Sequence, residues 1–214
     1  MVIIPNKESF FYPIDPHVPT HYELKVHVSE NNIEELDLCA EGWSTLAEDK
    51  QRLSETPEDK ELFGSSLEIS DHLKNTIPKA QTINKKTNKQ RFEMLFSQSN
   101  DENRTIQAIS VIKNKDDNTV YLEFLATNPN NIRARVNETQ LNQVKGAGSS
   151  IIYALFEKCV QDQRASISLK ALPPSVSFYE KLGFEIIGDG NVMQITLEKI
   201  QLFLQERALS LSML

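Results

Sequence analysis

An apolar stretch that we predict to be a helix starts with Gly146, Gly148, Ser149 and Ser150. The N-terminus of a helix presents backbone N–H groups without partners and carries a partial positive charge, and both favour an anion. Glycine lets the backbone approach a ligand closely because it has no Cβ. These residue types and their spacing predict a phosphate-binding loop at 143–150.

Two common phosphate-binding loops do not fit this segment. A P-loop needs Gly-Lys-Ser/Thr after its first glycine, whereas Lys145 precedes both glycines here. A dinucleotide-binding fingerprint needs glycine or alanine three residues after the second glycine, and this chain has Ile151 there. An ordinary helix start of the form Gly-Ala-Gly is the alternative without a ligand.

Three motifs together resemble the Gcn5-related N-acetyltransferase (GNAT) superfamily. LEFLATNP at 122–129 is similar to the family's fourth strand, and QVKGAG at 143–148 is similar to its glycine loop. SVSFYEKLGFEIIG at 175–188 is similar to its FYEKLGF segment. The resemblance covers residues 20–198 and implies that an acetyl group passes from acetyl-CoA directly to a primary amine of a small molecule or protein. It implies no metal ion.

The resemblance assigns the acetyl-CoA site to two segments. The backbone of Leu125, Ala126 and Thr127 is expected to bind the pantetheine arm and polarise the thioester carbonyl. The pyrophosphate is expected on the glycine loop, which consists of Gln143, Val144, Lys145, Gly146, Ala147, Gly148, Ser149 and Ser150.

Tyr179 occupies the position of the tyrosine that protonates the CoA thiolate in many members of the family. A phenol, with an ordinary pKa near 10, is a suitable donor to a thiolate in a cleft that holds little water. The alternative is that Tyr179 packs into the core beside Phe178.

Glu123 is the candidate general base. By the two-residue period of a strand it shares a face with Tyr121, Leu125 and Thr127. A carboxylate in an apolar strand is costly unless it is used or paired. We expect Glu123 to take the amine proton directly or through water; an ion pair with a basic side chain on a neighbouring strand is the alternative.

The elements that must position these residues follow the order strand, two helices, three strands, helix, strand, helix, two strands. Alternating and helical periodicities predict strands at 20–30, 91–98, 105–114, 119–129, 165–172, 184–188 and 192–199. They predict helices at 31–53, 57–75, from the glycine loop to about 161, at 173–183 and in the C-terminal tail. This order predicts a mixed α/β fold. The resemblance adds a mostly antiparallel central sheet, splayed between its fourth and fifth strands, with helices on both faces.

Local signals mark several boundaries. Gly64 is expected to interrupt the second helix, and Asn75 and Pro78 to end it before a basic loop at 79–91. Gly183 is expected at the C′ position of the short helix, and the sequence at 189–191 predicts a hairpin turn.

We expect an extended leader at 1–19, a single GNAT-like domain at 20–198 and a helical tail at 199–214. Residues 128–142 form an insertion, because the family usually has only a few residues between the strand and the glycine loop. Within it, Arg133 and Arg135 could meet phosphates or an acidic acceptor, or remain solvated.

The chain departs from the family at one further position, since Leu172 lies where an asparagine is common. This departure keeps open a second hypothesis, that the protein is a non-catalytic module that binds acyl-CoA and acts through protein contacts.

Composition narrows the class of protein. The 214 residues carry 30 acidic and 23 basic side chains, a net charge of −7, which argues against nucleic acid as a partner and suits an amine substrate. We expect no membrane partner and a cytoplasmic location, because no transmembrane run or secretory signal is evident. Cys39 and Cys159 are expected to be buried reduced thiols, the four histidines suggest no metal site, and a homodimer is allowed.

Overall fold

The computed structural model describes residues 9–11, 24–29, 33–87, 92–99, 104–115, 118–132, 144 and 146–212. The chain divides into two compact units. The first unit consists of Met1–Val111 with Phe124–Ile152, and the second of Ile112–Glu123 with Tyr153–Leu214. Two strands and one helix therefore begin in one unit and end in the other.

Antiparallel strands form the sheet of the first unit. β1 (Ser9–Phe11) pairs with β2 (Leu24–Ser29), and β2 pairs with β3 (Phe92–Ser99). β4 (Ile106–Asn114) and β5 (Thr119–Thr127) continue the order, so the predicted run of three strands with short connections is confirmed. β1 lies within the predicted leader, where we expected no strand.

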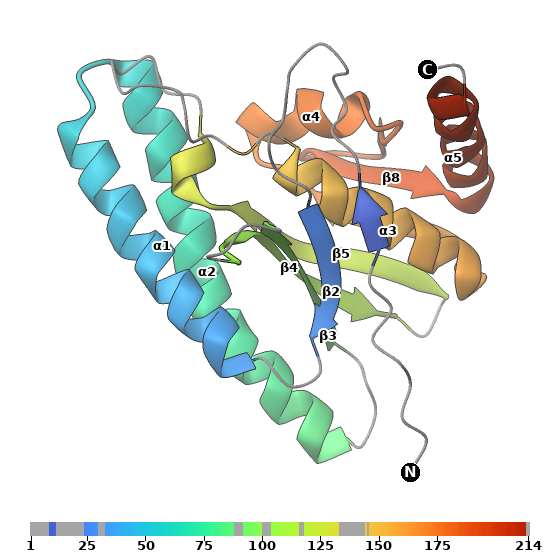
Figure 1. The fold of residues 1–214 in the computed structure, drawn as a ribbon, viewed down its shortest axis with the longest axis horizontal. Helices are drawn as coiled ribbons and strands as arrows, with labels where there is room; N and C mark the ends of the chain where they lie inside the picture. The colour runs from blue at the N-terminus through green and yellow to red at the C-terminus, as the bar shows by residue number, and fades with distance from the viewer. Residues whose placement is uncertain are drawn as a thin grey trace. The chain divides into compact units, whose positions relative to one another are not determined.

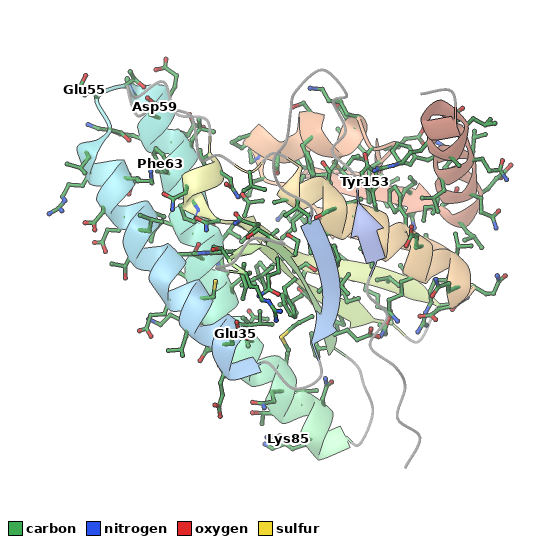
Figure 2. The ribbon with its side chains drawn as sticks, in the orientation of Figure 1. Glu35, Glu55, Asp59, Phe63, Lys85 and Tyr153 are labelled. Atoms are coloured by element: carbon green, nitrogen blue, oxygen red, sulfur yellow. The ribbon has the colours of Figure 1, made fainter. Side chains whose placement is uncertain are left out.

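Two long helices pack against the strands of this unit. α1 (Ile33–Leu53) and α2 (Pro57–Thr87) lie side by side (Figure 1). Figure 2 shows Glu55 and Asp59 at one end of this helix pair and Glu35 and Lys85 toward the other end. The helices and strands enclose a core of Leu36, Ala40, Trp43, Leu73, Ile77, Ala80, Met94, Phe96, Ile106, Ile109, Val111 and Ala126.

The prediction that α2 breaks at Gly64 and ends at Pro78 is wrong. The helix runs through both residues to Thr87. The predicted basic loop at 79–91 is therefore largely helical, and 88–91 lie outside the described residues. Proline removes one backbone N–H and crowds the preceding turn, which makes a helix end the usual outcome.

Burial on both sides of the proline explains why the helix continues. Leu73, Ile77 and Ala80 follow one face at helical spacing and are almost completely buried. Asn84, one turn further on, donates to the Phe92 carbonyl and accepts from the Phe92 N–H. Burial of this face offsets the cost of the proline, which is about 3 kcal/mol in an isolated helix.

The second unit contains the remaining strands. β6 (Ser166–Lys170) pairs parallel with the start of β5, β8 (Val192–Thr196) pairs antiparallel with β6, and β7 (Glu185–Ile186) pairs antiparallel with β8. Together with the antiparallel first unit, this confirms the predicted mixed α/β fold. The predicted hairpin is confirmed too, because β7 and β8 are consecutive antiparallel partners.

Helices of the second unit pack through aromatic rings. α3 (Ala147–Gln161) contributes Tyr153 and Phe156, whose ring centroids lie 5.7 Å and 5.5 Å from that of Phe203 on α5 (Leu197–Ser212). Figure 2 labels Tyr153 on α3. The guanidinium of Arg207, also on α5, lies 3.6 Å from the centroid of the Tyr153 ring. The predicted C-terminal helix is thus present and packs by its aromatic face.

The pairing of β5 with β6 is short. It joins Thr119–Leu122 to Ser166–Leu169 and ends there, while β5 itself continues to Thr127. Residues 123–127 therefore lie outside the parallel ladder.

Candidate functional site

The N-terminus of α3 has three backbone donors without an acceptor inside the helix. The first intrahelical bond runs from the Ser150 N–H to the Gly146 carbonyl at 2.8 Å, so the N–H groups of Ala147, Gly148 and Ser149 precede it. Such groups, with the helix dipole behind them, favour an anion.

Gly146 supplies the turn into this helix. Its φ of +82° lies in the left-handed region, which favours glycine over other residues. Among the described residues, no heavy atom lies within 4 Å of a Cβ built there, apart from chain neighbours. None of the described residues therefore fills the space beside the Gly146 Cα, which fits an approaching phosphate.

The two serines of the loop differ in the donors that they leave for a ligand. The Ser150 hydroxyl donates to the Ala147 carbonyl at 2.7 Å, and its N–H also bonds within the helix, so neither donor of Ser150 is left for a ligand. Ser149 offers its backbone N–H. No described residue forms a hydrogen bond with the Ser149 hydroxyl, so this donor also remains open to a ligand.

The end of β5 carries the second group of expected cofactor residues. Ala126 points into the core with Phe124, whereas Leu125 and Thr127 are half-buried on the opposite face. β5 ends at Thr127, two residues before the predicted end of this strand at Pro129, and a short 3₁₀ helix, η1 (Pro129–Asn131), follows.

The sequence did not single out the asparagines of η1. The Asn128 side chain accepts from the Asn130 N–H at 3.0 Å and caps η1, and proline at the first helical position is its sequence signal. Asn131 accepts from the Val144 N–H at 2.9 Å and so contacts the glycine loop directly. No local pattern indicates that contact, because thirteen positions separate the two residues.

Tyr179 is held by the C-terminal cap of α4 (Val176–Glu180). The Phe184 N–H donates to the Tyr179 carbonyl at 3.1 Å and the Gly183 N–H donates to the Glu180 carbonyl at 3.0 Å, which is a Schellman motif. Gly183 occupies the C′ position with φ +88°, as predicted. The Tyr179 ring packs edge-on against Phe184, with centroids 5.6 Å apart, so the cap fixes both its backbone and its ring.

The Tyr179 side chain is buried, with 7% of the residue exposed. Burial raises the pKa of its phenol well above the ordinary value, so the hydroxyl keeps its proton at neutral pH. Among the described residues, none makes a hydrogen bond with this hydroxyl. A buried phenol usually has a partner, so the arrangement leaves its proton available to a ligand.

Glu123 is half-buried on the face of β5 that also carries Tyr121. Burial and, to a smaller extent, the Glu123 carboxylate raise the pKa of Tyr121. Glu123 has no hydrogen bond or ion pair with any residue that the structure describes, so the basic partner considered from the sequence is not seen among them.

Comparisons with known proteins bear on this arrangement. No protein-family model matches the chain. The uncharacterized N-acetyltransferase ycf52 of Pyropia yezoensis is 36% identical over 86 residues, which are 38% of this chain and 49% of that protein. The chain thus spans about half the length of the curated relative that it matches.

A structure from Desulfovibrio desulfuricans, assigned to the acetyltransferases of the GNAT family, has a TM-score of 0.52 to this chain at 12% identity. The alignment covers 80% of this chain and 99% of that one. The chain has the fold of the GNAT superfamily. The fold that the three motifs imply is thus confirmed. A PaiA N-acetyltransferase from Thermoplasma acidophilum, solved with coenzyme A, aligns at a TM-score of 0.49 and 15% identity over 80% of this chain and 98% of that one.

The GNAT motif residues fall into two groups in this chain. The first unit contains Leu125–Thr127, Val144 and 146–150, and the second contains Glu123 and Tyr179. Four residues that the sequence analysis names lie outside the described residues: Gln143 and Lys145 of the glycine loop, and Arg133 and Arg135 of the insertion.

The part of the chain that the structure describes lacks two features. It contains no group of three or more His, Cys, Asp or Glu side chains that could hold a metal ion. None of the helices in the described ranges is long and apolar enough to cross a membrane.

Proposed function

We propose that this protein is an N-acetyltransferase that moves the acetyl group of acetyl-CoA directly to a primary amine. The observation that carries the proposal is the start of α3, where Gly146 has a left-handed backbone and the N–H groups of Ala147, Gly148 and Ser149 precede the first intrahelical hydrogen bond. The GNAT fold and a buried Tyr179 with an available proton support it. The acceptor is the amine of a small molecule or of a protein, and the net charge of −7 favours a cationic one.

Two stretches of backbone are suited to hold the cosubstrate, which supplies the acetyl group as an activated thioester. The N–H groups of Ala147, Gly148 and Ser149 donate to the pyrophosphate. The backbone of Leu125–Thr127 binds the pantetheine arm and polarises the carbonyl. Fixed donors of this kind stabilise developing negative charge without reorganising.

Two side chains handle the protons. Glu123 accepts a proton from the attacking amine, directly or through water, while the C–N bond forms. Tyr179 donates its phenolic proton to the sulfur while the C–S bond breaks, so that CoA leaves as a thiol. Solvent then returns a proton to Tyr179 and removes one from Glu123, which restores the starting state.

One observation supports a second candidate, a non-catalytic module that binds acyl-CoA. Leu172 occupies the position where the family often has asparagine, and it precedes η3 (Pro173–Ser175) without a side-chain hydrogen bond. One polar contact to the cofactor is then missing. The enzyme and the module differ in turnover, not in affinity for CoA.

Calorimetric titration with acetyl-CoA, CoA and ATP tests the proposal. We expect micromolar binding of acetyl-CoA and CoA and none of ATP, followed by release of free CoA thiol when amine acceptors are added. Absence of binding to all three ligands contradicts both candidates. Binding of acetyl-CoA without acetylation of any amine, in a screen that includes basic peptides, favours the module.

We propose a cytoplasmic location, in keeping with two free cysteines.

A further inference from the structure

The Asn131 side chain connects the glycine loop to the sheet of the first unit. We propose that Asn131 is a positioning residue, which holds Val144 and thereby the start of α3 in the place where the pyrophosphate binds. This inference rests on the proposed function for the identity of the ligand. It rests on hydrogen bonds within the first unit for the geometry.

The Asn131 amide is used on both sides. Its Oδ1 accepts from the Val144 N–H at 2.9 Å, and its Nδ2 donates to Gln107 Oε1 at 2.9 Å. A backbone N–H can only donate, so the amide oxygen must face Val144 and the nitrogen must face Gln107. The orientation of the side chain is therefore determined by its partners.

Gln107 is a fixed support for this bridge. It lies on β4 and is buried, with 6% of the residue exposed. Its carbonyl accepts from the Asn128 N–H at 2.9 Å, and its Nε2 lies 3.5 Å from Ser99 Oγ on β3. Buried networks in which each group has a partner favour one geometry over its alternatives. The bridge therefore fixes the glycine loop relative to β3 and β4.

Val144 needs this acceptor. The residue is 7% exposed and lies two positions before Gly146, outside any helix or strand. A buried backbone N–H without a partner is strongly unfavourable, so loss of the Asn131 oxygen would make the loop move toward another acceptor. Such a movement displaces the N–H groups of α3, and hydrogen bonds to an anion weaken steeply with distance and angle.

Three variants of the full-length chain test the proposal. Asn131→Ala removes both contacts, and Asn131→Asp keeps the acceptor for the Val144 N–H. Asn130→Ala is the matched control, because Asn130 lies on the same turn with an exposed side chain. The readouts are the dissociation constant for CoA, hydrogen exchange at the Val144 amide and the midpoint of urea unfolding.

For Asn131→Ala we expect CoA binding to weaken about tenfold, which corresponds to about 1.4 kcal/mol, with a similar acceleration of exchange at Val144. Asn131→Asp is expected to preserve the protection of this amide, and Asn130→Ala to change neither readout. A merely structural role would lower the unfolding midpoint without a selective loss of CoA binding.

The proposal is overturned if Asn131→Ala binds CoA as tightly as Asn130→Ala, or if exchange at Val144 is unchanged. If the wild-type chain binds no CoA, the proposed function fails, while exchange at Val144 still decides whether Asn131 holds the loop. Should Asn131→Ala fail to fold, Asn131→Asp carries the test. Its Val144 amide must then stay as protected as in the control.

Discussion

Asn84 pairs with Phe92 as a neighbouring strand residue would. The Phe92 N–H donates to Asn84 Oδ1 at 3.0 Å, and Asn84 Nδ2 donates to the Phe92 carbonyl at 2.7 Å. One amide side chain thus satisfies both backbone groups of the first residue of β3. This contact connects the last turns of α2 to the sheet of the first unit.

Replacement of Asn84 by alanine should destabilise the protein, because two partly buried backbone groups lose their partner. At about 1 kcal/mol for each hydrogen bond, we expect the free energy of unfolding in urea to fall by about 2 kcal/mol. Asn75→Ala is the control, since Asn75 makes one exposed bond, to the Asp71 carbonyl. Its effect should stay within about 0.5 kcal/mol. Equal effects of the two variants would mean that Asn84 does not anchor the helix.

The Asn84 contact also shows where sequence reasoning stops. Local rules ended α2 at Pro78, and they describe proline correctly in an isolated helix. They take no account of the partners that Ile77, Ala80 and Asn84 find in β3 and the core. The strands and most other helices were predicted because their periodicities are long and regular.

The candidate site likewise contains features that the sequence predicts and contacts that it does not. Gly146, Gly183 and Tyr179 belong to contiguous motifs whose local geometry is largely determined by neighbouring residues, and Gly183 takes the C′ position that the sequence predicts. The bridge through Asn131 joins residues 24 positions apart on one side and thirteen on the other. Contacts of that kind depend on the folded sheet, so no spacing rule reveals them.

Two glycine-to-alanine substitutions should have opposite effects. At Gly146 the left-handed backbone penalises a Cβ, so we expect a loss of about 1 kcal/mol of stability together with weaker CoA binding. Gly42 is exposed within α1, and no heavy atom of the described residues lies within 4 Å of a Cβ built there. Gly42→Ala should therefore gain about 1 kcal/mol from helix propensity. Urea unfolding measures both, and a stabilising Gly146→Ala contradicts the proposed turn.

The two cysteines should react slowly in the folded protein. Burial raises the pKa of Cys39 to about 12 and that of Cys159 to about 11, whereas an ordinary thiol titrates near 9. The thiolate is the reactive form, so labelling with iodoacetamide at pH 8 should be much slower than in urea. Rapid labelling of both thiols in the native protein would contradict this protected state.

The same shifts determine how stability changes at alkaline pH. A raised pKa in the folded state means that the unfolded chain releases thiol protons first. Stability should then be fully present below about pH 9 and decline through the interval up to pH 11–12. Cys39→Ala should reduce that decline, and an identical pH dependence of the variant would contradict the assignment to Cys39.

Tyr179→Phe should separate chemistry from binding. The variant keeps the ring packing against Phe184 and removes only the proton donor, so we expect kcat to fall about 100-fold while CoA affinity changes less than about threefold. Tyr153→Phe is the matched control, because Tyr153 is also buried and also has a raised pKa. It should retain turnover. A Tyr179→Phe enzyme with wild-type kcat would remove Tyr179 from the mechanism.

The pH dependence of kcat gives an independent check on Tyr179. A general acid must carry its proton, and burial raises the pKa of this phenol above its ordinary value near 10. Deprotonation of Tyr179 should therefore not lower kcat anywhere between about pH 8 and pH 10. The measurement is kcat across this range with the amine acceptor held mostly unprotonated and saturating. The raised pKa would be contradicted by a decline of kcat that is centred below pH 10 and is absent from Tyr179→Phe. Such a decline would show that the pKa of Tyr179 lies below its ordinary value.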